Sequence, residues 1–131
     1  MLWGEASQEE VAVLLGCSDL FLYTATRGIN PVAVLEAMAA GLPVIASLAP
    51  RSLETLLAEG RGKVISVRDS GAVCRALVEI LNDLPRSALM GQRARAYIAT
   101  HHTAEALRRS LLRTTGWPLT ARDVMQAPAE G

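Results

Sequence analysis

The chain has 131 residues, with 13 basic and 13 acidic side chains, and is 50% hydrophobic but only 4% aromatic. This length suits about one domain, and the zero net charge gives no electrostatic reason to expect a nucleic-acid partner or an anionic membrane surface. No apolar stretch approaches the roughly 20 residues of a membrane span, and no basic start precedes an apolar run, so we expect a cytoplasmic protein without a membrane span.

The first predicted elements are a helix and a strand. Ser7 and Glu10 have the spacing of a capping box, which predicts a helix over residues 8–15 that ends at Gly16. The apolar run over residues 19–24 is too short for a helix and is typical of a strand buried on both faces of a parallel sheet.

The alternation of helix and strand continues along the chain. Asn30 can cap a helix and Pro31 suits a first helical position, so we predict a helix over residues 31–40 that is closed by a left-handed Gly41. The remaining pattern predicts a strand over 43–47, helix 51–59, strand 63–67, helix 71–82 capped by Asp69 or Ser70, and, after a break at Pro85, helices over 86–100 and 104–114.

Strands that alternate with helices through short connections form parallel sheets with right-handed crossovers and helices on both faces. We therefore predict a partial Rossmann-like α/β domain over residues 1–115 and a poorly ordered tail over 116–131. Three strands, with residues 1–4 as a fourth candidate, are few for a doubly wound sheet, so the chain is expected to be a fragment of a larger fold.

Other polar and thiol side chains are given structural roles. Cys17 and Cys74 lack metal-ligand spacing and lie in apolar helical contexts, where we expect buried thiols. His101 and His102 lie near a helix end, where capping explains them better than a metal. No glycine-rich dinucleotide or phosphate-loop motif occurs, residues 60–63 are interpreted as a helix exit, and no metal or cofactor is expected.

The loop and helix after the first strand form the candidate binding site, because ligands of open parallel sheets bind beyond the carboxyl ends of the strands. There Gly28 permits close backbone approach, Arg27 can contact an anion, and the helix start favours a phosphate. An ordinary strand-to-helix turn needs the same glycine and cap, so a purely structural role stays open. The predicted binding residues are Thr24, Arg27, Gly28, Ile29, Asn30, Pro31, Val32 and Glu36.

Glu36 is the acidic residue of an otherwise apolar helix, and a carboxylate is seldom fully buried without a partner. If it faces the strand ends, it can accept hydrogen bonds from a ribose diol. The alternative is an ordinary glutamate that faces solvent.

The stretch LEAMAAGLPVIAS, preceded by a strand that ends in a loop of small residues, resembles the family-4 glycosyltransferases of GT-B fold. The resemblance extends from LWGEASQEEVAVLLGCSDLFLYTA through GRGKVISVRD to the helices that end near Arg113, so it covers most of the chain. It implies the C-terminal lobe, which binds the nucleotide-sugar donor. Such enzymes usually transfer the sugar with retention, need no bound metal for the chemistry and bind the acceptor mostly through the other lobe.

The resemblance also implies residue roles. The family has two glutamates separated by seven residues, and Glu36 matches the second, which contacts the nucleotide ribose. The first glutamate, which contacts the donor sugar and supports catalysis, falls on Gly28, and the glycine after it falls on Ile29. No catalytic residue is therefore assignable, and either Asn30 or Arg27 substitutes for the first glutamate or the sugar is held differently.

The N-terminal lobe and the first strands of the C-terminal lobe, with the Arg and Lys that contact the diphosphate, have no counterpart in this sequence. We therefore expect weak donor binding by the isolated chain, and two classes of function stay open. The first is the donor-binding portion of a retaining, hexosyltransferase-like enzyme that is completed by an N-terminal lobe. The second is a truncated, inactive module for binding or protein interaction, whose exposed sheet edge pairs in a homo-oligomer.

Overall fold

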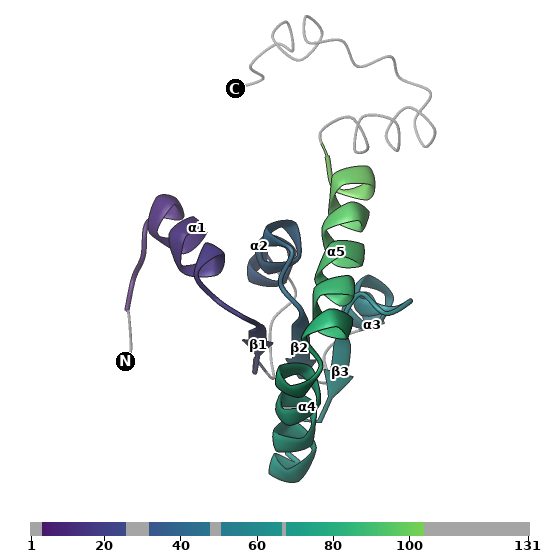
Figure 1. The fold of residues 1–131 in the computed structure, drawn as a ribbon. Helices are drawn as coiled ribbons and strands as arrows, with labels where there is room; N and C mark the ends of the chain where they lie inside the picture. Colours follow the sequence, from purple (N-terminus) through teal and green to yellow (C-terminus); the bar gives the residue numbers. More distant parts are fainter. Residues whose placement is uncertain (1–3, 26–31, 48–50, 67, 104–131) are drawn as a thin grey trace, which may run out of the picture. The chain divides into compact units, whose positions relative to one another are not determined.

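The computed structural model describes residues 4–25, 32–47, 51–66 and 68–103, and Figure 1 labels their helices and strands. Residues 1–98 form one compact unit, which contains the sheet and the site discussed below. The elements follow in the order α1 (Gln8–Gly16), β1 (Phe21–Tyr23), α2 (Val32–Ala40), β2 (Val44–Ser47), α3 (Arg51–Leu57), β3 (Lys63–Ile65), α4 (Ser70–Asn82) and α5 (Leu84–His101).

The three strands form one parallel sheet in the order β1-β2-β3. Phe21 is the partner of Val44 in the first pair, and Ile45 is the partner of Lys63 in the second. A parallel sheet needs a crossover between consecutive strands, and α2 and α3 supply these crossovers. The predicted α/β, partial Rossmann-like architecture is therefore confirmed, with strands shorter than the sequence pattern indicated.

Alternate residues of the strands enter two separate cores. On one face Val44, Ala46 and Tyr23 pack with Met38 of α2, and this cluster also takes in side chains of α1, α3 and α5. On the other face Ile45 and Ile65 pack with Ala76 and Ile80 of α4. Helices thus cover both faces, and burial of each large aliphatic side chain contributes about 1.5–3 kcal/mol to folding.

The helix caps that the sequence predicts within the described residues are present in the structure. The backbone N–H of Glu10 donates to Ser7 Oγ at 3.2 Å, and the N–H of Ser7 donates to a Glu10 carboxylate oxygen at 2.8 Å. This second hydrogen bond holds the pKa of Glu10 below its ordinary value. Gly41, with φ of +82°, ends α2, and the Asp69 side chain caps α4 by accepting from the N–H of Ala72 at 2.9 Å.

Two expectations were wrong. Cys17 and Cys74 are exposed, because Cys17 follows the last turn of α1 and Cys74 lies on the face of α4 opposite the buried Ala76 and Ile80. Pro85 does not delay the last described helix, which starts at Leu84 and accommodates the proline in its first turn, where a missing N–H costs no helical hydrogen bond. The predicted helix over 104–114 and the tail lie outside the described residues.

Among the described residues, no helix is both long and apolar enough to cross a membrane.

A close backbone approach fixes α5 against the end of α2. An ideal Cβ added to the buried Gly91 would collide with the carbonyl oxygen of Gly41, and it would lie 2.8 Å from the Gly41 carbonyl carbon and 3.3 Å from that of Leu42. Real Cβ atoms do not approach backbone atoms so closely, so α5 can reach this turn only with a glycine at position 91.

Replacing Gly91 with Ala should therefore destabilise the chain. We expect a loss of about 1–3 kcal/mol in the free energy of unfolding, typical of overpacking, although alanine favours a helix more than glycine does. Urea denaturation followed by circular dichroism measures the change. Gly16→Ala is the control, because an added Cβ there has no heavy atom within 4 Å; equal stability of both variants would contradict the tight contact.

Candidate functional site

The predicted site begins at the carboxyl edge of the sheet. Because α2 runs from the end of β1 to the start of the parallel strand β2, its first residue lies on the side where the strands end. Thr24, directly after β1, is exposed, and Val32, the first residue of α2, is 47% exposed. Both are available at the surface, as a binding role requires.

Five of the predicted binding residues lie outside the described part of the chain. They are Arg27, Gly28, Ile29, Asn30 and Pro31. Their roles stay predictions from the sequence, and the structural description of the site starts at α2.

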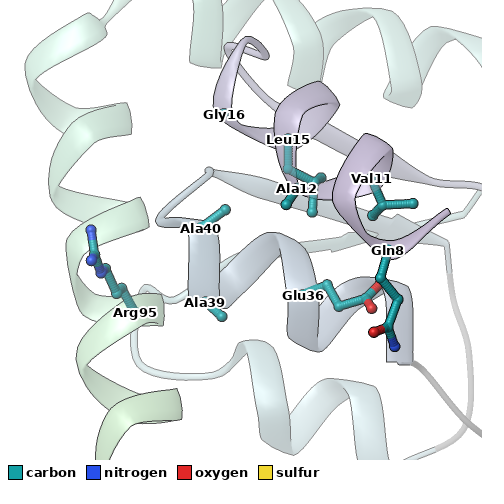
Figure 2. A pocket seen from close by; sticks show the side chains of 9 residues that line it. All are labelled: Gln8, Val11, Ala12, Leu15, Gly16, Glu36, Ala39, Ala40 and Arg95. Atoms are coloured by element: carbon teal, nitrogen blue, oxygen red, sulfur yellow. The ribbon is translucent and has the colours of Figure 1, made fainter.

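Glu36, in the second turn of α2, lines an open pocket of about 470 Å³ (Figure 2). Pockets that bind small molecules usually have volumes of about 300–1,000 Å³, so this one is large enough for such a ligand. It is lined by Gln8, Val11, Ala12, Leu15, Gly16, Glu36, Ala39, Ala40 and Arg95. We call this space the α1–α2 groove.

The walls of the α1–α2 groove are single faces of two helices. The α1 residues have the spacing of one helical face, and Glu36, Ala39 and Ala40 have the same spacing on α2. Alanine and glycine on these faces leave room between the helices. Figure 2 shows Glu36 directed toward Gln8 at one end of the groove, with Arg95 on α5 at the other end, on the side of Ala39 and Ala40.

The carboxylate of Glu36 is partly buried and has no hydrogen bond or ion pair among the residues that the structure describes. Its helix directs Val34, Ala37 and Met38 into the core, which leaves Glu36 on the side that faces α1. The side chain lines a concave surface that is open to solvent, so both the ligand-binding role and the alternative of an ordinary solvent-facing glutamate stay predictions. A carboxylate here can accept hydrogen bonds from a ligand.

Arg95 was not predicted as a site residue. It is exposed and, within the described ranges, forms no ion pair. Its side chain passes the glycine that ends α2, since a Cβ added to Gly41 would lie 3.6 Å from Arg95 Cδ. No local motif marks this arginine, because only the packing of α5 on α2 brings it to the groove.

A buried arginine holds the segment of α5 that carries Arg95. Arg61, only 7% exposed, donates from Nε to the carbonyl of Leu56 and from Nη2 to the carbonyl of Thr55, each at 2.9 Å. Its guanidinium carbon also lies 4.1 Å from the centre of the Tyr97 ring. The sequence pattern predicts residues 60–63 as a helix exit; in the structure residues 58–61 form the turn after α3, Lys63 already begins β3, and Arg61 additionally joins the end of α3 to α5.

The described residues contain no cluster of three or more His, Cys, Asp or Glu side chains that could hold a metal ion. His101 instead pairs through Nδ1 with the hydroxyl of Thr100 at 2.6 Å.

The fold and the groove together define an α/β domain with one open pocket that is lined by a carboxylate and a guanidinium, neither of which forms an ion pair among the described residues. Residues 1–97 match the model of the family described as Glycosyl transferases group 1. The chain therefore belongs to this family, and the matched segment contains every residue that lines the α1–α2 groove. The glycosyltransferase resemblance is thus confirmed at this level, whereas family 4 and the C-terminal lobe stay predictions.

The chain is also similar to the N-acetyl-alpha-D-glucosaminyl L-malate synthase of Bacillus anthracis. The two are 30% identical over 100 residues, which make up 76% of this chain and 26% of that protein. The chain therefore spans about a quarter of the length of this curated relative.

Replacing Arg61 with Met should test how firmly α5 is held. The variant keeps a long side chain but leaves the carbonyls of Leu56 and Thr55 without their donor, so we expect a loss of about 2–3 kcal/mol in unfolding free energy. Thermal and urea denaturation measure the effect. The matched control is Arg75→Met, an exposed arginine with one ion pair to Asp69 at 3.5 Å, which should change stability by less than about 1 kcal/mol. Similar losses in both variants would contradict a structural role specific to Arg61.

Proposed function

We propose that this chain is the donor-binding portion of a glycosyltransferase, which holds a nucleotide diphosphate sugar while the sugar is transferred with retention to an acceptor. The observation that carries the proposal is the position of Glu36. In a chain of the glycosyl transferases group 1 family, its partly buried carboxylate lines an open pocket and has no partner among the described residues.

The donor would lie with its diphosphate at the start of α2 and its ribose at Glu36. The free backbone N–H groups and the dipole of a helix N-terminus favour an anion, and the sequence adds Arg27 and Asn30 just before this helix. Glu36 follows Val32 by one helical turn, and its two carboxylate oxygens can accept both hydroxyls of a ribose diol.

The rest of the reaction requires groups beyond this pocket. Among the residues that the structure describes, Glu36 is the only carboxylate that lines the α1–α2 groove, and Gly28 stands where the resembled family has its sugar-contacting glutamate. An N-terminal lobe would bind the acceptor and complete the catalytic cleft. Because the relative is named for N-acetylglucosamine and L-malate, an N-acetylglucosamine donor and L-malate are the first pair to assay.

Replacing Glu36 with Gln should weaken donor binding about five- to tenfold, because a neutral amide accepts weaker hydrogen bonds from hydroxyls than a carboxylate does. Titration of the chain with uridine, guanosine and adenosine diphosphate sugars, followed by NMR, measures these affinities. Glu54→Gln, on the exposed surface of α3, is the control and should leave them unchanged. Absence of binding to any of these donors, or equal effects of the two substitutions, would refute the proposed site.

A second candidate function is a non-catalytic relative that keeps the fold for binding or protein interaction. The glycine at position 28 favours it, because a glycine has no side chain with which to contact a sugar hydroxyl. In the described sheet β1 is an edge strand that pairs with β2 alone. The edge of β1 that faces away from β2 is where such a module would pair with a second chain. Light scattering of the purified chain separates a monomer from such an oligomer.

Replacing Gly28 with Glu should distinguish the two functions. If the donor sugar lies beside this position, the new carboxylate should raise affinity for a nucleotide sugar severalfold without raising affinity for the corresponding nucleoside diphosphate. Gly28→Gln is the size-matched control and should give a smaller gain. A glutamate that leaves nucleotide-sugar affinity unchanged, with the chain oligomeric, would favour the interaction module.

A further inference from the structure

Helix α4 carries an apolar stripe on the side that does not pack on the sheet. Ala76 and Ile80 of this helix are buried against the strands. In contrast, Cys74 is exposed, Val78 is 56% exposed and Leu81 is 49% exposed. These three residues have the i, i+4 and i+7 spacing of a single helical face, and we call them the α4 stripe. Single apolar residues are ordinary at a surface, but three in line are typical of an interaction surface.

Four charged side chains follow one another along the flank of α4 beside the stripe. In chain order they are Asp69, Arg75, Glu79 and Arg86, and their side chains are 43–74% exposed. Arg75 lies 3.5 Å from the carboxylate of Asp69, and Arg86 lies 3.3 Å from that of Glu79. Glu79 also pairs with Lys63, so this flank is the one on the side of β3. The charges along the flank therefore alternate in the order negative, positive, negative, positive.

This order of charges is complementary to its own reverse. In an antiparallel helix pair related by a twofold axis, the same flank of each helix faces that of its partner. With the axis midway between Arg75 and Glu79, Arg75 faces Glu79 of the second copy, and Asp69 faces Arg86 of the second copy. A parallel pair would instead bring like charges together. We propose that the α4 stripe is the interface of a symmetric dimer, in which it packs antiparallel on the same stripe of a second copy of this chain.

The size of α4 sets the strength of this dimer. The helix has 13 residues, so it is about 20 Å long and about 10 Å wide. One such helix on each side buries less than the about 1,200–2,000 Å² of a standard interface. The dimer should therefore be weak, with a dissociation constant of about 10–100 μM. Burial of the apolar stripe stabilises it, and the charges along the flank determine its antiparallel orientation.

This interface is independent of the proposed donor site. α4 packs on the face of the sheet that presents Ile45 and Ile65, whereas α1 and α2 pack on the opposite face with Val44 and Ala46. A second copy on α4 therefore leaves the α1–α2 groove open. The interface also differs from strand pairing at the outer edge of β1, because it uses side chains of a helix.

Charge reversal tests the antiparallel order. Analytical ultracentrifugation of the whole chain at low salt, over about 1 μM to 1 mM, should show a monomer that becomes a dimer. Arg75→Glu and Glu79→Arg should each weaken the dimer about tenfold, because the symmetry brings like charges together twice. An equimolar mixture of the two variants should form a heterodimer about as stable as the unmodified dimer, since both facing pairs are then of opposite charge. Circular dichroism checks that both variants are folded.

A substitution in the stripe gives a second, independent test. Val78→Asp should abolish the dimer over the same concentrations, because it places two carboxylates close to the twofold axis. Val13→Asp is the matched control, since Val13 is 65% exposed on α1 and lies outside the interface, and this variant should still form the dimer. A chain that stays monomeric, charge reversals without effect, or a mixture that forms no heterodimer would refute the interface. A dimer that survives Val78→Asp would also refute it, and would form through another surface, such as the outer edge of β1.

Discussion

The contact between Gly91 and Gly41 is the constraint on which the groove depends. Gly41 adopts a left-handed conformation to end α2 and return the chain to β2, and this turn exposes backbone where a helix would otherwise present side chains. Gly91 lets the backbone of α5 lie directly against that turn. Arg95 lies one turn further along α5, so the same contact places its side chain beside the end of α2, where it lines the groove.

A polar network fixes α5 at a second place. Burial of a charged guanidinium is costly unless its donors are satisfied, and Arg61 donates to two carbonyls at the end of α3 and to the carboxylate of Glu59 at 2.6 Å. The ring of Tyr97 covers the guanidinium face. Because Tyr97 lies two residues from Arg95, the end of α3 and the turn after α2 together determine how α5 presents Arg95 to the groove.

The sequence predicted the features that depend on residues close together in the chain, and it did not predict those that depend on contacts between distant helices. The capping box at Ser7, the left-handed Gly41 and the Asp69 cap are local, and each was confirmed. Cys74 was misjudged because apolar neighbours in the sequence do not say which face of α4 meets the sheet. Arg61 and Arg95 could not be found in this way, since their surroundings come from helices far apart in the chain. Glu36 was identified from the sequence, but the pocket that it lines needed the packing of α1 on α2.

Which groups of the proposed donor site would contribute to binding, and which to catalysis, follows from the part of the donor that each group would contact. Under the proposed function, a helix start and Glu36 would contact only the phosphate and the ribose, which are shared by the donor and by the nucleoside diphosphate that remains after transfer. Interactions that bind substrate and product equally lower the free energy of both and do not accelerate the transfer step. Discrimination for the sugar-bearing donor, and stabilisation of the transition state, must therefore come from groups that contact the sugar. Position 28 is where the resembled family places such a group. A glycine there, in place of the glutamate, would leave the affinity for the nucleotide unchanged but would remove the side-chain contact with the sugar, which is the contact most useful for catalysis. Under the proposed function, this chain would hold the nucleotide, and the groups that act on the sugar would have to come from outside the α1–α2 groove.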